Sequence, residues 1–126
     1  MASDERTVER QLQGKPEAVV ELYRRFIALV EACGPFTYSV TKTAITLKGE
    51  RRGFAGAKPK PRWLDGYFDV ERQISDERIR SASPYTKGLF VHQFRIVEPR
   101  QLDSEFAEWI GEAYAVGAGG HLLAGD

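Results

Sequence analysis

The chain is poor in cysteine, has no long apolar run and carries no excess of either charge. Its single cysteine, Cys33, cannot form an intramolecular disulfide, which excludes a disulfide-stapled scaffold and indicates a reducing compartment. The longest apolar stretches, such as residues 26–30, fall far short of the roughly 20 residues that a membrane-spanning helix needs. Residues 1–10 contain no apolar segment of a secretory signal. We therefore expect a cytoplasmic protein without a membrane-spanning segment.

Length and charge balance predict one ordinary folded domain. The 18 basic side chains are matched by 18 acidic ones, so the chain lacks the overall basicity of a protein that condenses nucleic acid. A chain of 126 residues that is 42% apolar buries about two-thirds of its unfolded surface on folding, without help from disulfides or metals. We expect one domain over residues 1–117, followed by a flexible Gly- and Ala-rich tail over residues 118–126.

Helical periodicity occurs near both ends of the chain. Apolar residues spaced three and four apart predict an amphipathic helix that begins near Pro16 and ends before Gly34 and Pro35. A shorter helix precedes Gly14. A third is expected after Asp103, whose side chain can cap the first turn.

Between the helices, from residue 36 to about residue 97, the apolar pattern changes to a period of two. This predicts an antiparallel meander of five or six strands. Over residues 64–70, alternation directs Leu64 and Phe68 to the core. The side chains expected on the opposite face are Trp63, Asp65, Tyr67 and Asp69. The predicted fold class is α+β, with a sheet packed against N-terminal and C-terminal helices.

Several segments carry a family resemblance. They are Leu22, Tyr23 and Phe26 in the long helix, residues 41–45 (TKTAI), residues 51–56 (RRGFAG) and residues 109–114 (WIGEAY). On these residues the chain resembles, over about residues 12–117, a bacterial family described as domain of unknown function 5655. The resemblance implies a lysine after the first strand and a basic residue before Phe-Ala, here Lys42 and Arg52 or Arg51. It implies no chemical role for them.

Basic side chains are concentrated in residues 42–62, which hold seven Lys and Arg residues and one acidic residue. Strand geometry near a hairpin places Lys48 and Arg52 on one solvent-facing side, beside Trp63 and Tyr67. Cations beside aromatic rings are typical of surfaces that bind phosphates or bases. The predicted binding residues are Lys42, Lys48, Arg52, Trp63 and Tyr67. The expected partner is an anionic ligand, nucleic acid or an acidic protein surface. Alternatively, the cations only protect a sheet edge from pairing with other chains.

Residue types suited to catalysis are sparse. The two histidines, His92 and His121, are far apart, so no Ser-His-Asp or Cys-His arrangement can be recognised. One cysteine and two distant histidines cannot supply a zinc site. We predict no catalytic residue, cofactor or metal. His92 is expected to be a hydrogen-bonded sheet residue, and Cys33 a small, inert core residue.

Two rival functions remain open. Asp65 and Asp69 share one face of a strand and could hold a divalent ion in a small metal-assisted hydrolase or nuclease; otherwise they are expected to pair with Arg62 or Arg72. The protein could instead be a scaffold or interaction subunit, in which the acidic side of the last helix of one copy meets the basic hairpin of another. The expected oligomeric state is a monomer or a weak homodimer.

Overall fold

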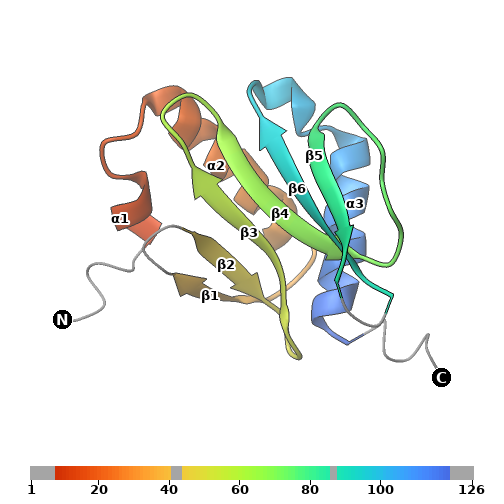
Figure 1. Cartoon of the computed structure of the whole chain (residues 1–126). Helices are drawn as coiled ribbons and strands as arrows, with labels where there is room; N and C mark the ends of the chain where they lie inside the picture. Colours follow the sequence, from red (N-terminus) through yellow and green to blue (C-terminus); the bar gives the residue numbers. More distant parts are fainter. Residues whose placement is uncertain (1–7, 41–43, 86–87, 120–126) are drawn as a thin grey trace.

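The computed structural model describes residues 8–40, 44–85 and 88–119, in which helices cover one face of a six-stranded sheet (Figure 1). The helices are α1 (Val8–Leu12), α2 (Glu17–Glu31), the short 3-10 helix η2 (Pro99–Gln101) and α3 (Ser104–Gly117). The strands are β1 (Thr37–Val40), β2 (Ile45–Lys48), β3 (Gly53–Pro59), β4 (Leu64–Val70), β5 (Ile79–Pro84) and β6 (Phe90–Ile96). The predicted α+β class is confirmed.

The sheet is antiparallel throughout, in the order β1-β2-β3-β4-β6-β5. Strands β1 to β4 form the expected meander, but β6 then lies between β4 and β5. The amino-acid composition of β5 and β6 explains this strand order. Strand β6 buries His92, Phe94 and Ile96 and suits the interior, whereas β5 is mostly exposed and ends at Pro84, a residue that sheets tolerate at an edge.

The two long helices form where the sequence predicted them. Helix α2 begins after Pro16 and buries one apolar stripe, which consists of Val19, Leu22, Tyr23, Phe26, Ile27 and Val30. Helix α3 is capped by Asp103, whose carboxylate accepts a 3.0 Å hydrogen bond from the backbone N–H of Phe106. None of the helices in the described part of the chain has the length and apolar character needed to cross a membrane.

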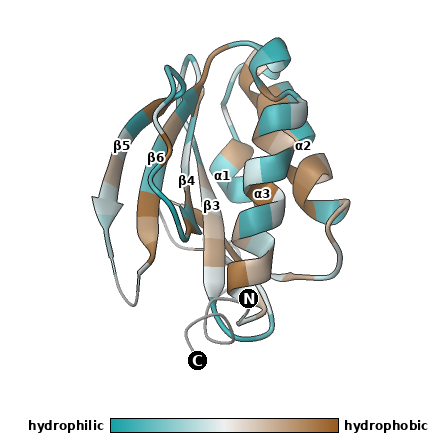
Figure 2. Ribbon diagram, turned by 90° about the vertical axis from the view of Figure 1, so that its right-hand side faces the viewer, coloured by the Kyte–Doolittle hydropathy of each residue, from teal (hydrophilic) through white to brown (hydrophobic). Residues whose placement is uncertain are grey.

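An aromatic cluster fills the space between the sheet and the helices. Its rings are Phe26 of α2, Phe68 of β4, Phe94 of β6, and Phe106 and Trp109 of α3. Neighbouring ring centroids lie between 5.2 Å (Phe94 and Phe106) and 6.5 Å (Phe26 and Phe106) apart, the separation that favours edge-to-face contact. All of the labelled helices lie on this side of the sheet, and none covers the other side (Figure 2).

A buried arginine fastens the segment before β5 to α3. The guanidinium group of Arg78, whose side chain is 6% exposed, pairs with Asp76, Asp103 and Glu105 at 2.8 to 2.9 Å. It also lies over the ring of Trp109, with 4.6 Å from the guanidinium carbon to the ring centroid. These contacts hold the edge of the sheet against the N-terminus of α3.

The C-terminal end of α3 fastens the hairpin between β2 and β3. The carbonyl oxygen of Gly117 accepts hydrogen bonds from the backbone N–H groups of Arg51 (2.8 Å) and Arg52 (3.2 Å). Carbonyl groups in the last turn of a helix have no partner within the helix, so this contact satisfies one of them. The expected tail, residues 118–126, lies largely outside the described residues.

Candidate functional site

The two faces of the sheet differ because successive strand residues point to opposite sides. Leu64 and Phe68 of β4 point to the helices, as expected. We call the side that bears no helix the open face. It carries Thr46 and Lys48 of β2, Gly56 and Lys58 of β3, Asp65, Tyr67 and Asp69 of β4, and Gln93 and Arg95 of β6. Cross-strand register therefore gathers polar, charged and aromatic side chains from four strands.

Tyr67 lies near the centre of the open face, with its ring against the backbone of Gly56. A Cβ atom at position 56 would lie 2.6 Å from Cζ of Tyr67 and 2.8 Å from its hydroxyl, so a glycine is needed to leave room for the ring. The Tyr67 hydroxyl shares a 2.9 Å hydrogen bond with Oγ1 of Thr46. Nζ of Lys58 lies 5.9 Å from the ring centroid. Burial raises the pKa of the Tyr67 hydroxyl.

Arg52 lies beside the open face, where the hairpin contact with Gly117 positions its backbone. One terminal nitrogen pairs with Oδ2 of Asp69 at 3.1 Å. Its guanidinium carbon lies 5.3 Å from the ring centroid of Tyr85. Asp69 is 5% exposed; this burial raises the pKa of its carboxyl group, although the charge and hydrogen bond of Arg52 act in the opposite direction.

Arg95 forms the third pair, with Trp63, the residue immediately before β4. Its guanidinium carbon lies 4.1 Å from the ring centroid of Trp63. Two of its nitrogens donate to the Asp65 carboxylate at 2.8 and 3.3 Å, and this bidentate contact raises the pKa of Arg95. The indole N–H of Trp63 is shielded from solvent and has no acceptor among the described residues.

The open face and its rim thus carry three cation–aromatic pairs and more cations than carboxylates. The pairs are Trp63–Arg95, Tyr67–Lys58 and Tyr85–Arg52. Trp63 immediately precedes β4 and lies four residues before Tyr67, and four residues of extended backbone span about 13 Å. The cations on or beside this face are Lys48, Arg52, Lys58 and Arg95, and the carboxylates are Asp65 and Asp69.

A family model described as a domain of unknown function, DUF5655, matches residues 8–117, which is most of the 126-residue chain. The chain belongs to the DUF5655 family. The resemblance drawn from the sequence motifs is therefore confirmed, and the matched region runs from the start of α1 to the end of α3. Comparison with the curated proteins and with the solved structures finds no match.

In this DUF5655 domain, the predicted binding residues share one side of the sheet as far as the structure describes them. Lys48 and Tyr67 lie on the open face, and Arg52 and Trp63 adjoin it through their contacts. The side chains of Lys48 and Thr46 lie on the same side of β2. A Cβ atom built at Gly53 would lie 3.3 Å from the Thr46 methyl and 3.9 Å from Cγ of Lys48. Lys42 lies outside the described residues.

Three side chains of this surface were missed as binding residues in the sequence. Lys58 was included only as one of the seven basic residues within residues 42–62. Arg95 alternates with Phe94 and Ile96 along β6, so period two could have placed it on the open face. Tyr85 follows β5, and no local pattern links it to Arg52, because that contact depends on how the segments meet in space.

The expected partners of the β4 carboxylates are wrong. Asp65 is bound by Arg95 and Asp69 by Arg52, whereas Arg72 pairs with Glu112 of α3 at 2.8 and 3.0 Å. Within residues 8–40, 44–85 and 88–119, no group of three His, Cys, Asp or Glu side chains could hold a metal ion. The arrangement gives the hydrolase hypothesis no support.

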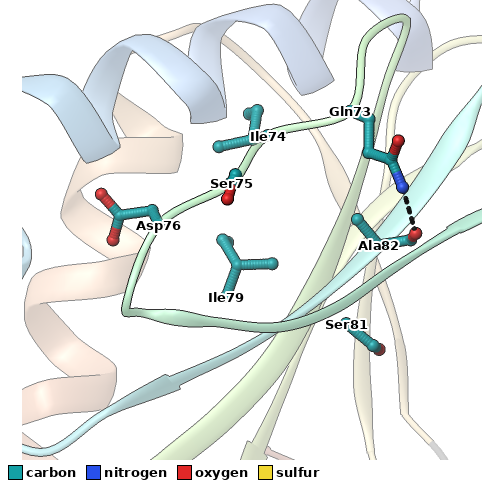
Figure 3. Close-up of a pocket in the computed structure, with 7 residues that line it drawn as sticks. All are labelled: Gln73, Ile74, Ser75, Asp76, Ile79, Ser81 and Ala82. Atoms are coloured by element: carbon teal, nitrogen blue, oxygen red, sulfur yellow. Dashed lines mark hydrogen bonds between the residues drawn. The ribbon is translucent and has the colours of Figure 1, made fainter.

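A hollow of about 390 Å³ lies at the β5 edge of the sheet (Figure 3). It is lined by Gln73, Ile74, Ser75, Asp76, Ile79, Ser81 and Ala82. The side-chain amide of Gln73 bridges it by donating a 2.9 Å hydrogen bond to the carbonyl oxygen of Ala82. Both oxygens of Asp76 bond to Arg78. The charged group in this lining is thus already paired within the chain.

His92 and Cys33 have local roles. The His92 ring is buried, accepts a 2.9 Å hydrogen bond at Nε2 from the backbone N–H of Ile74, and lies 3.0 Å at Nδ1 from the carbonyl oxygen of Phe90. The expected hydrogen-bonded sheet histidine is confirmed. Cys33 is only partly buried at the rim of the core, because it follows the last turn of α2; burial still raises the pKa of its thiol.

Proposed function

We propose that this DUF5655 protein is a non-catalytic binding module whose open face takes an anionic ligand. The observation that carries the proposal is the set of three cation–aromatic pairs on and beside the open face, the side of the sheet on which none of the described helices lies. Cations next to aromatic rings bind anions and planar groups together. The two unpaired lysines, Lys48 and Lys58, have no carboxylate partner among the described contacts and supply charge for a ligand.

Edge protection explains these cations poorly. Lysine deters unwanted pairing where it lies on an edge strand. Lys48 and Lys58 lie on β2 and β3, which both have a strand on each side; the edges of the described sheet are β1 and β5. A cation on the face of an interior strand does not blunt an edge, so another reason for its position is needed.

The interaction-subunit hypothesis gains less support. It requires the acidic side of α3 to meet the basic hairpin of another copy. Glu112 is already bound by Arg72 and Glu105 by Arg78 of the same chain, so much of that acidic charge is compensated internally. A ligand from outside the chain is the better occupant for the open face.

Heparin binding as a function of salt tests the proposal. The double variant Lys48→Gln/Lys58→Gln removes two cations without leaving a buried carboxylate. We expect it to bind heparin more weakly. The slope of log K against the logarithm of the salt concentration should become shallower by about one unit per lysine. The matched control is Arg24→Gln/Arg25→Gln, which removes two exposed charges from α2 in the other layer. Equal losses in both variants, or no salt-dependent binding by the unmodified protein, would refute the proposal.

A further inference from the structure

The open face carries features that a plain polyanion does not need. Heparin or polyphosphate is attracted by charge alone and gains nothing from an aromatic ring. Here, Tyr67 is held by Thr46 and accommodated by Gly56 at the centre of the face. Its ring is only partly buried and lies beside Lys58. An aromatic ring held in place in this way offers a planar surface on which a nucleobase can stack.

The carboxylates of the open face also favour a ligand that carries bases over a plain polyanion. Asp65 and Asp69 lie on the same strand as Tyr67 and pair with Arg95 and Arg52, so these two arginines have little net charge left for a row of phosphates or sulfates. Each carboxylate holds an arginine over an aromatic ring, Arg95 over Trp63 and Arg52 over Tyr85. Such sites suit uncharged bases, which stack on rings and on guanidinium planes. The unpaired lysines, Lys48 and Lys58, suit phosphates.

We infer that the ligand of the open face is a single strand of nucleic acid, whose bases stack at Tyr67 and Trp63 while its phosphates contact Lys48 and Lys58. This inference rests on the proposed function and names its ligand class. Duplexes are disfavoured because their bases are stacked on one another and cannot reach the rings. Trp63, just before β4, and Tyr67 are separated by four residues, which span about 13 Å when extended, so they would contact bases that are not immediate neighbours.

Competition between labelled and unlabelled polyanions tests the inference. A short labelled single-stranded oligonucleotide is titrated with the full chain, followed by fluorescence anisotropy, and displaced by the same strand, by its duplex, by heparin and by inorganic polyphosphate. We expect the single strand to displace at least about tenfold better than the duplex. A duplex that competes equally well would overturn the inference.

Variants of Tyr67 separate stacking from charge. Tyr67→Leu removes the ring, and we expect roughly tenfold weaker binding of the single strand with unchanged heparin binding. Tyr67→Phe keeps the ring and loses only the hydroxyl that bonds to Thr46, so it should bind nearly as the unmodified protein does. Arg24→Gln/Arg25→Gln is again the control for charge. Equal binding of the single strand by Tyr67→Leu and the unmodified protein would contradict base stacking.

Tryptophan emission gives a readout that does not depend on Tyr67 variants folding. The chain has two tryptophans. Trp109 is only 3% exposed and out of reach of a ligand, so quenching by a stacked base would report on Trp63. We expect quenching by the single strand but not by polyphosphate, and its loss in Trp63→Phe. If heparin and polyphosphate bind through the two lysines while single strands neither quench nor compete better, the ligand class is wrong and the proposed function stands. If no polyanion binds, both are wrong.

Discussion

At the scale of single residues, Arg78 is the most constrained charge in the described part of the chain. It is buried, bonded to three carboxylates and in contact with Trp109. Removal of one partner from such a network leaves the others without compensation. The hydrogen bond from Arg78 lowers the pKa of Asp76, whereas the pKa of Asp103 is lowered first by the backbone N–H of Phe106 and then by Arg78. Both carboxyl groups are therefore favoured in their charged form.

We predict that Arg78→Met lowers the free energy of unfolding by about 2 kcal/mol. The loss is below the largest values for buried pairs because Asp103 and Glu105 remain about half exposed and can be solvated. Urea denaturation measures it. Arg100→Met, which breaks an exposed pair with Glu98, should cost less than about 0.5 kcal/mol. Similar losses in the two variants would argue against the buried clamp.

His92 makes stability depend on pH. Burial lowers the pKa of its imidazole from the ordinary value of 6.5, so below that pH the unfolded chain takes up a proton that the folded chain resists. The His92 contribution is fully present above pH 6.5 and is lost as the pH falls toward the lower pKa of the folded state. Denaturation series across this range should show a steeper decline for the unmodified protein than for His92→Gln. Parallel curves would contradict a neutral, buried ring.

At the scale of elements, glycines mark where strands and helices approach closely. A Cβ atom at Gly66 of β4 would collide with the Gly56 carbonyl and with the Phe94 ring. At Gly111 of α3, a Cβ atom meets nothing within 4 Å. The same substitution therefore has opposite consequences in the two elements.

We expect Gly66→Ala to destabilise the protein by about 2 kcal/mol, as overpacking does. Gly111→Ala should stabilise it by roughly 0.5–1 kcal/mol, because alanine restricts the unfolded chain and favours the helix. Thermal unfolding of both variants checks the pair. A stabilised Gly66→Ala would mean that β4 and β6 are packed less closely than described.

At the scale of the whole molecule, the described surface lacks a large apolar patch for self-association. The large apolar side chains exposed there, Tyr38, Tyr85 and Val97, belong to different strands or their ends. The open face is polar and charged instead. Stable interfaces between copies usually have an apolar centre.

We therefore expect the protein to sediment as a monomer at both low and high salt. A dimer at low salt that dissociates at high salt would instead support contact between the acidic side of α3 and the basic hairpin. The Lys48→Gln/Lys58→Gln variant is the control, since it would weaken that dimer and leave a monomer unchanged.

The sequence by itself determined the fold class, the two long helices and the side of β4 on which each residue lies. These features depend on local periodicity and on helix capping, as at Asp103. Both signals come from residues that are close together in the sequence. The alternation that placed Tyr67, Asp65 and Asp69 together follows from the period of a strand alone.

Only the tertiary structure decided which strands are neighbours and which charges meet. The position of β6 beside β4 brings Arg95 to Asp65 across thirty residues of sequence, and the α3–hairpin contact places Arg52 near Asp69. The local sequence pattern does not predict such pairs, because strand order depends on which strand is suited to lie between two others and which to an edge. That order is what turned a basic stretch of sequence into a face of alternating cations, carboxylates and rings.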